Sequence, residues 1–218
     1  MENFRNENGL PVIEKVIAAV RDNSAMLSEI DGAVGDGDHG INMAKGFGMA
    51  ADKLAADRAA GTATSLSRGL AVIGTVLLTE IGGAMGPLYG TLFRSLARAC
   101  KDAADIDSAV FESMLVTARD GVVSLGNAKV GDKTMLDTLA PAVDAFCASR
   151  SAGKGFSDCL RAMMKAAEAG KDSTKDLVAK LGRSSRLGER SRGVLDAGAV
   201  SCWLILTALG TSMIALLG

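Results

Sequence analysis

Apolar residues recur at helical spacing along almost the whole chain, and this pattern limits the fold more than any other feature of the sequence. Between Pro11 and Ile30 they lie mostly three or four residues apart, which places their side chains on one face of an α-helix. Similar stretches cover residues 41–57, 62–81, 87–102, 107–124, 133–149, 155–169, 172–181 and 197–216. The alternation typical of strand hairpins is missing from the sequence. We therefore expect an all-α protein with eight or nine helices.

The composition supports the same fold class. Of 218 residues, 48% are hydrophobic but only 4% are aromatic, which suits closely packed helices better than a β-sandwich. The length suits a single domain over residues 1–218. A formal net charge of −1 gives no electrostatic reason to expect a nucleic-acid or anionic-membrane partner. The four cysteines lie far apart without a C-x-x-C pair, so neither disulfides nor a zinc site are expected.

Residues 197–218 carry no charged side chain, and two interpretations stay open. The segment is long enough to cross a bilayer, and Arg190 and Arg192 precede it. However, it contains polar residues such as Ser201 and Thr207, and a helix that is apolar all round is also expected at the centre of a bundle. We favour burial. The first eight residues lack the apolar run of a signal peptide, and we therefore expect a cytoplasmic protein.

The polar residues with chemical potential gather in the breaks between the expected helices. These breaks are residues 31–40, 82–87, 126–134 and 182–198. In an up-and-down bundle alternate loops lie at the same end. We therefore expect several of these segments to converge on one site.

The segment 31–42 (DGAVGDGDHGIN) is rich in both glycine and aspartate. It matches G-x-G-x-x-G, yet no buried strand precedes it, and Asp36 and Asp38 would repel a bare pyrophosphate. An EF-hand starting at Asp36 also fails, because Ile41 and Phe47 stand where the calcium loop needs Gly and Glu. Neither motif therefore accounts for the segment.

Three carboxylates, on Asp31, Asp36 and Asp38, lie within this short segment. Carboxylates crowded in this way favour a cation between them, and hard oxygen ligands together with phosphate suit Mg²⁺. The helix expected from Ile41 would add N–H donors for the same phosphate. In the alternative interpretation, Asp31 and Asp38 only cap helices and form turns. Three aspartates beside the chain's one histidine, His39, favour a metal–phosphate site.

Four sequence blocks resemble the L subunit, or L domain, of dihydroxyacetone kinases. They are Asp31 with residues 35–43 (GDGDHGINM), residues 82–91 (GGAMGPLYGT), residues 131–135 (GDKTM) and residues 182–191 (GRSSRLGERS). The blocks occur in the order of that family and span nearly the whole chain.

The resemblance implies an antiparallel barrel of about eight amphipathic helices with ADP or ATP at one rim. It also implies that Asp31, Asp36 and Asp38 hold a pair of Mg²⁺ ions. Carried over residue by residue, the nucleotide contacts fall on His39, Gly40, Ile41, Asn42, Ala84, Met85, Gly126, Met135, Arg183, Asp196, Ala197 and Gly198.

Three positions depart from the pattern of the family. Met85 replaces a serine in the glycine loop, which removes a hydroxyl group that would face phosphate. Ala197 replaces a proline in the Asp-Pro-Gly turn, and Glu80 adds an acid before the glycine loop. The first change weakens the phosphate assignment at Met85, and the other two concern the base and ribose contacts.

The family implies a kinase that acts only with a K-type partner subunit, on which the small ketose is bound. The phosphoryl donor is either ATP or a bound ADP that a phosphohistidine carrier of the phosphotransferase system rephosphorylates, and a stand-alone L chain favours the second arrangement. A rival hypothesis is a nucleotide-sensing module that docks a regulator and performs no chemistry.

Overall fold

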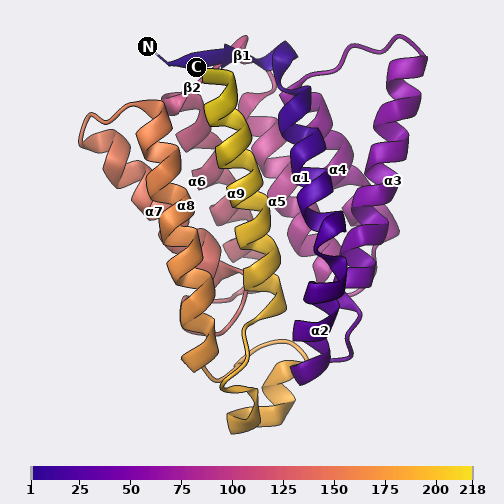
Figure 1. The fold of residues 1–218 in the computed structure, drawn as a ribbon, viewed down its shortest axis with the longest axis vertical. Helices are drawn as coiled ribbons and strands as arrows, with labels where there is room; N and C mark the ends of the chain where they lie inside the picture. The colour runs from indigo at the N-terminus through magenta and orange to yellow at the C-terminus, as the bar shows by residue number, and fades with distance from the viewer. Residues whose placement is uncertain (1, 218) are drawn as a thin grey trace.

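The computed structural model describes residues 2–217, which form a bundle of α-helices with one very small sheet (Figure 1). The helices are α1 (Leu10–Asp22), α2 (Ser24–Val34), α3 (His39–Ala59), α4 (Leu66–Glu80), α5 (Met85–Cys100), α6 (Ser108–Gly126), α7 (Leu136–Ser151), α8 (Phe156–Ser173) and α9 (Ala197–Leu217). Short 3₁₀ helices are η1 (Asn6–Asn8), η2 (Thr174–Asp176) and η3 (Ser184–Ser191). The expected all-α class is confirmed.

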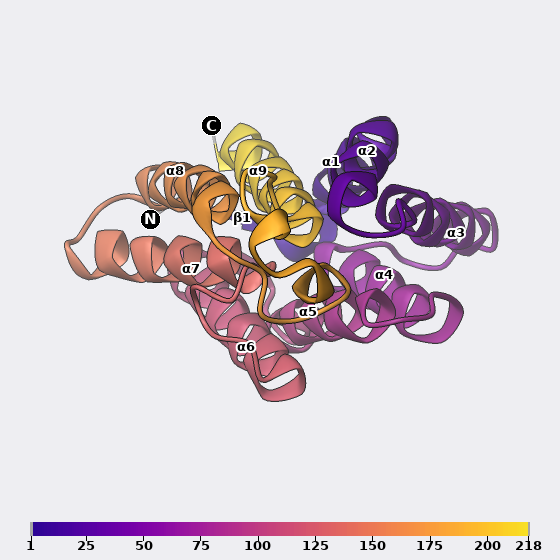
Figure 2. The ribbon, with the colours of Figure 1, turned by 90° about the horizontal axis from the view of Figure 1, so that it is seen from below.

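The helices form a closed ring (Figure 2). From α3 to α9 each helix packs against the next in sequence, and α1 closes the ring by packing against both α9 and α3. Helix α2 follows α1 after a break at Asn23, whose side-chain amide donates to the carbonyl of Ala19 at 2.8 Å. Because α1 and α2 together occupy one place in the ring, the nine helices of the described chain build an eight-membered barrel.

The barrel interior holds the apolar faces predicted by the helical spacing. In α1 the buried residues are Val12, Ile13, Val16, Ile17 and Val20. Phenylalanines at positions 111, 146 and 156 stack edge to face where α6, α7 and α8 meet. Such contacts add to the burial of apolar surface that stabilises the bundle.

Helix α9 has the length and the mean hydropathy, 2.0, of a membrane-spanning segment. In the structure it packs against α1, α2, α7 and α8. Twelve of its residues are buried within the described chain. The arrangement supports the expectation that this segment is a core helix.

Three local features differ from the sequence-based expectation. The helix expected over residues 172–181 is wrong, because α8 ends at Ser173 and only the single turn η2 follows. The expected helix from Pro11 to Ile30 is divided at Asn23. A strand, β1 (Asn3–Arg5), pairs antiparallel with β2 (Asp105–Asp107), although no strand was expected. This pairing buries Phe4 and Ile106.

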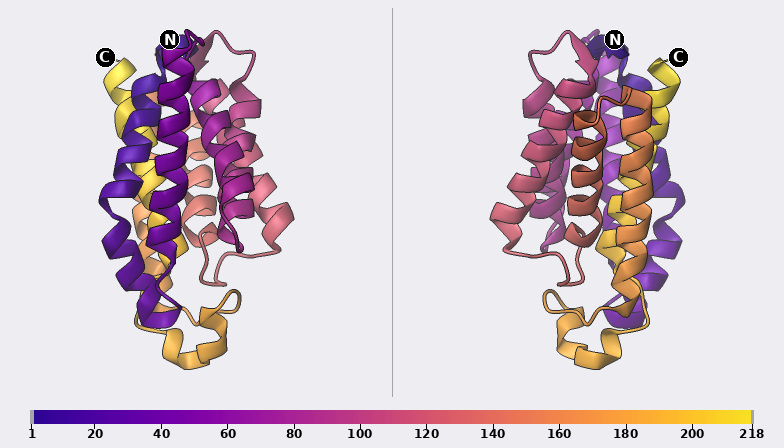
Figure 3. Two further views of the ribbon diagram at one scale, coloured as in Figure 1. Left: turned by 90° about the vertical axis from the view of Figure 1, so that its right-hand side faces the viewer. Right: turned by 90° about the vertical axis from the view of Figure 1, so that its left-hand side faces the viewer.

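The segments that connect α2 to α3, α4 to α5, α6 to α7 and α8 to α9 lie at one end of the barrel, which we call the site end (Figures 1 and 3). The β1–β2 sheet lies at the opposite end. The longest connection, residues 174–196, crosses the end of the barrel that faces the viewer in Figure 2, and we call it the strap. The expected convergence of the polar segments is therefore present.

Candidate functional site

Three aspartates meet at the site end between α2 and α3. Asp31 lies in the last turn of α2, whereas Asp36 and Asp38 lie in the short turn before α3. One carboxylate oxygen from each residue lies within 4.8 Å of the others. Gly37 has a φ of +75°, a conformation that glycine adopts without strain. This turn brings together the carboxylates that the sequence singled out.

Glycine also sets the distance between α2 and α3. A Cβ atom on Gly40 would lie 1.9 Å from the carbonyl oxygen of Ser24 and 2.6 Å from Oγ of Ser28. A Cβ atom on Gly35 would lie 2.6 Å from Oδ1 of Asp31. Any side chain at these positions would push the helix start away from Asp31.

The capping interpretation holds for one aspartate and not for another. Oδ2 of Asp31 accepts a hydrogen bond from the backbone N–H of His39 at 3.3 Å. Asp38 occupies the N-cap position of α3, yet its side chain accepts no capping hydrogen bond. Its carboxylate is therefore free of capping hydrogen bonds and available to a cation.

Arg183 reaches the carboxylates from the strap. Its guanidinium group forms an ion pair with Asp36 and lies 3.8 Å from Oδ2 of Asp38. All three side chains are partly exposed to solvent. The acidic cluster thus already attracts one cationic group, and the same arginine could bind an anion held beside the cluster.

The ring of His39 points to a hydrogen-bond network that links three helices. Its Nε2 lies 2.9 Å from Oγ of Ser201 in α9, which lies 2.6 Å from the hydroxyl of Tyr89 in α5. The Tyr89 hydroxyl donates to the carbonyl of Gly198 at 2.9 Å. Burial lowers the pKa of His39 to about 4, although Asp31 opposes the shift, so the imidazole is neutral at pH 7. The network fixes the start of α3 against the start of α9.

Asp196 caps α9 at the other side of the site. Its Oδ1 accepts from the backbone N–H of Ala199 at 2.7 Å, and its own N–H donates to Oγ1 of Thr174 at 3.0 Å. Desolvation raises the pKa of Asp196 to about 7, and the hydrogen bond from Ala199 opposes this shift. A carboxyl group with this pKa can change its charge near neutral pH.

The remaining predicted contacts lie at the site end in different settings. Ala84 and Met85 stand at the start of α5, and Gly126 ends α6. Ile41 is 66% exposed on the first turn of α3. Met135, by contrast, is only 4% exposed and belongs to the core, where it lies beside Gly198. Its side chain therefore packs inside the barrel and does not line an open surface in this structure.

Sequence reasoning missed the residues whose hydrogen bonds hold the site segments in place. They are Tyr89, Lys133, Asp137, Thr138 and Ser201. The Asp137 carboxylate accepts from the N–H groups of Gly131 and Thr134 at 2.5 and 2.7 Å. Tyr89 is the only tyrosine of the sequence, and Ser201 is a polar residue in an uncharged helix, so both could have been noticed. Their hydrogen bond could not be predicted, because the two residues lie over a hundred positions apart.

A closed barrel of helices that gathers three carboxylates at a helix N-terminus defines a class of helical proteins suited to metal-bound phosphate groups. Within this class, the chain belongs to the DAK2 domain family, whose model matches residues 33–211. The antiparallel helical barrel that the sequence resemblance implied is the fold observed.

Two relatives and one solved structure illustrate the similarity. The chain is 37% identical over 188 residues to the ADP-binding subunit DhaL of the PEP-dependent dihydroxyacetone kinase of Escherichia coli, covering 85% of this chain and 87% of that protein. It is 32% identical over 198 residues to the ADP-binding subunit DhaL of PEP-dependent dihydroxyacetone kinase 2 of Listeria innocua, covering 91% and 90%. The crystal structure of the dihydroxyacetone kinase from C. freundii in complex with AMP-PNP and Mg²⁺ superposes with a TM-score of 0.66 and 26% identity, covering 94% of this chain and 34% of that one.

Proposed function

We propose that this chain is the ADP-binding subunit of a kinase for dihydroxyacetone or a related small ketose. The observation that carries the proposal is the cluster of Asp31, Asp36 and Asp38, whose carboxylate oxygens lie within 4.8 Å at the start of α3. The relatives named as ADP-binding kinase subunits support the nucleotide and the reaction class. The ketose itself would be bound by a separate K-type subunit.

The donor set fits magnesium. Three carboxylates offer only hard oxygen ligands, which Mg²⁺ prefers together with substrate phosphates and water. Asp31, Asp36 and Asp38 would hold a pair of Mg²⁺ ions. When bound, the metal would offset negative charge on the phosphate groups during phosphoryl transfer. Arg183, already paired with Asp36 and Asp38, would contribute a further positive charge.

The nucleotide would lie between the first turn of α3 and the turn before α9. The N–H groups at Gly40 and Ile41 would receive phosphate at the helix N-terminus, whereas Asn42, whose N–H donates to the carbonyl of Asp38, would contribute through its side chain. Further contacts would come from Ala84, Met85, Gly126, Met135, Arg183, Asp196, Ala197 and Gly198. The neutral His39 ring, bonded to Ser201 at 2.9 Å, would orient the helix start.

Exposed apolar side chains support docking of the K-type partner at the site end. Ile41, Leu125, Val130 and Leu181 are between 38% and 66% exposed, and all four stand on segments at the site end. Apolar side chains that remain exposed around a polar site are typical of surfaces that bind another protein. A partner seated there would bring its bound ketose to the phosphate.

The donor would be a phosphohistidine carrier that rephosphorylates a retained ADP. The PEP-dependent relatives support this arrangement over exchange of free ATP, and a cytoplasmic location follows from it. Copurification of stoichiometric ADP through gel filtration is the expected result. Nucleotide-free protein that exchanges ATP rapidly would contradict the retained-ADP arrangement.

Removal of one carboxylate tests the site. Asp36→Ala should weaken Mg²⁺-dependent ADP binding about 10- to 100-fold, because it deletes a charge-assisted ligand interaction worth about 1.5–3 kcal/mol. Asp52→Ala is a matched control, since Asp52 is exposed on α3 outside the cluster. Isothermal calorimetry with and without Mg²⁺ measures the change. Equal affinities for Asp36→Ala and the control would refute the metal site.

A coupled assay separates the kinase from the rival role as a nucleotide-sensing module. The assay contains the K-type subunit, ketose and phosphorylated carrier. Wild-type protein should support ketose phosphorylation, and Asp36→Ala should abolish it while docking to the K-type subunit persists. Nucleotide binding without any turnover in the wild-type assay would instead favour the sensing role.

A further inference from the structure

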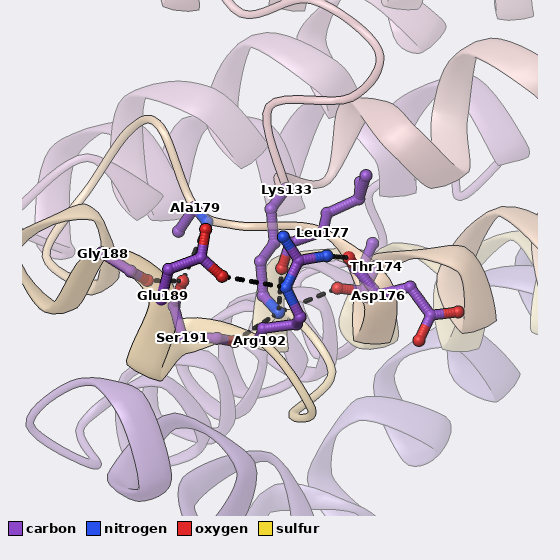
Figure 4. A network of polar contacts seen from close by, with 9 residues as sticks. All are labelled: Lys133, Thr174, Asp176, Leu177, Ala179, Gly188, Glu189, Ser191 and Arg192. Carbon is purple, nitrogen blue, oxygen red and sulfur yellow. Dashed lines mark hydrogen bonds and ion pairs between the residues drawn. The ribbon is translucent and has the colours of Figure 1, made fainter.

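Lys133 is an almost fully buried lysine, with 1% of its surface exposed, that no metal or nucleotide contact uses. Its ammonium group donates to the backbone carbonyls of Thr174, Leu177 and Ser191 at 2.8, 3.2 and 2.7 Å (Figure 4). It also donates to the carbonyl of Val194 at 2.6 Å. An ammonium group has three N–H donors and no acceptor. Four converging carbonyl oxygens therefore form a cage that the charge of Lys133 fills.

The four carbonyls come from the two ends of the strap. Thr174 and Leu177 lie where the chain leaves α8, whereas Ser191 and Val194 lie where it returns to α9. Lys133 thus closes the neck of a loop whose projecting part, residues 178–190, carries Arg183. Loops with adjacent ends and a projecting body are frequently functional.

Other hydrogen bonds also join the two ends of the strap. The N–H of Gly193 donates to the carbonyl of Lys175 at 2.7 Å, and the N–H of Ala179 donates to Oγ of Ser191 at 2.9 Å. Arg192 donates to the carbonyl of Asp176 and contacts Glu189 (Figure 4). All of these residues belong to the strap itself. Lys133 differs from them because it enters from a different part of the chain, and so it connects the strap to the barrel.

The backbone at Lys133 is held in an uncommon conformation. Its φ is +62°, in the left-handed region that lysine rarely adopts and that costs free energy. The turn that imposes it is fixed by the buried carboxylate of Asp137, which accepts from Gly131 and Thr134. Burial lowers the pKa of Lys133, and the charge of Asp196 opposes that shift. The turn and the cage together hold the side chain in one place.

We propose that Lys133 is a positioning residue that ties the neck of the strap and thereby sets Arg183 over the carboxylates of the metal site. The four carbonyls form a binding site for an ammonium group, and the side chain of Lys133 provides that group. The effect on ligand affinity rests on the proposed nucleotide function, whereas the effect on the strap does not. Arg183 is the link, because its guanidinium contacts Asp36 and Asp38 only while the strap projects towards them.

Hydrogen exchange in the ligand-free protein tests the tie. Lys133→Met keeps a long side chain and deletes every donor. The amides of Ala179 and Gly193 should lose protection at least tenfold, while amides within α5 keep theirs. Lys129→Ala is the control, because Lys129 is exposed in the same turn. Unchanged protection at Ala179 and Gly193 would overturn the proposal, and it would do so even if the protein bound no ADP.

A double-mutant cycle tests the link to Arg183. Lys133→Met should weaken Mg²⁺-dependent ADP binding about tenfold in the wild-type background. In the Arg183→Ala background the same change should have little further effect, since the residue that it positions is gone. Fully additive losses would show that Lys133 does not act through Arg183. A purely structural role would lower both affinities alike.

Chemical rescue tests the cage. Lys133→Ala leaves the four carbonyls without a donor, and added methylammonium should restore the protection of Ala179 and Gly193. Tetramethylammonium, which has no N–H group, serves as the control. Restoration by methylammonium alone supports an ammonium site, including the case in which Lys133→Ala folds only in its presence. No restoration, or equal restoration by both ions, would overturn that assignment.

Discussion

Replacement of Gly40 by alanine should weaken ligand binding at the metal site more strongly than it lowers the stability of the fold. The new Cβ atom would lie 1.9 Å from the carbonyl oxygen of Ser24 and 2.7 Å from the backbone nitrogen of Ser28. Carbon and oxygen atoms normally approach no closer than about 3.3 Å, so the start of α3 must move by about 1 Å or more. Overpacking of this kind costs about 1–3 kcal/mol. The displaced turn holds Asp36 and Asp38, and a 1 Å misplacement in a preorganised site can cost about 100-fold in function.

Gly48→Ala provides the matched control in the same helix. A Cβ atom there meets nothing within 4 Å, so the higher helix propensity of alanine should raise the free energy of unfolding by up to about 1 kcal/mol. Urea denaturation and calorimetric titration with ADP and Mg²⁺ measure both variants. If Gly40→Ala matches Gly48→Ala in stability and in ligand affinity, the close approach of α2 and α3 does not shape the site.

Two further predictions concern groups behind the site. Because the folded pKa of Asp196 is raised to about 7 from an unfolded value of about 4, the contribution of its protonated form is present below pH 4 and is lost as the pH rises through 7. Without Mg²⁺, the free energy of unfolding of Asp196→Asn should therefore rise relative to wild type by about 2 kcal/mol between pH 4 and pH 8. This figure is about half of what the full pKa shift would give, because the residue is half-buried. A difference in urea denaturation that does not change with pH would contradict this prediction. Tyr89→Phe removes the hydroxyl that bonds Gly198 and Ser201, and should lower the free energy of unfolding by about 1–3 kcal/mol. Denaturation curves that coincide with wild type would show that this buried bond contributes nothing.

The sequence was sufficient where the pattern is local. Helical spacing predicted α3, α4 and α5 to within a few residues, because side chains three and four residues apart share one face. The three aspartates were also found from sequence, since they lie within eight residues and the turn between them brings their carboxylates together.

The sequence was insufficient where distant residues decide the conformation. The strap was expected to begin with a helix over 172–181, but its carbonyls bond to Lys133, which lies 41 to 61 residues earlier in the chain. The pairing of Asn3 with Asp107 joins segments about a hundred residues apart, and no local pattern announces it. The burial of Met135 beside Gly198 joins the start of α7 to α9, and no local pattern predicts this contact.

Because the ring of helices is closed, the site does not depend on where along the ring the chain starts. The start of β1 and the end of α9 both lie at the end opposite the site, and β1 packs against α9. The exposed connection at residues 60–63, between α3 and α4, also lies at that end. A circularly permuted chain that joins the end of α9 to the start of β1 and opens at this connection would keep every neighbour in the ring. For the same reason, a domain fused before β1 or after α9 would not cover the carboxylates.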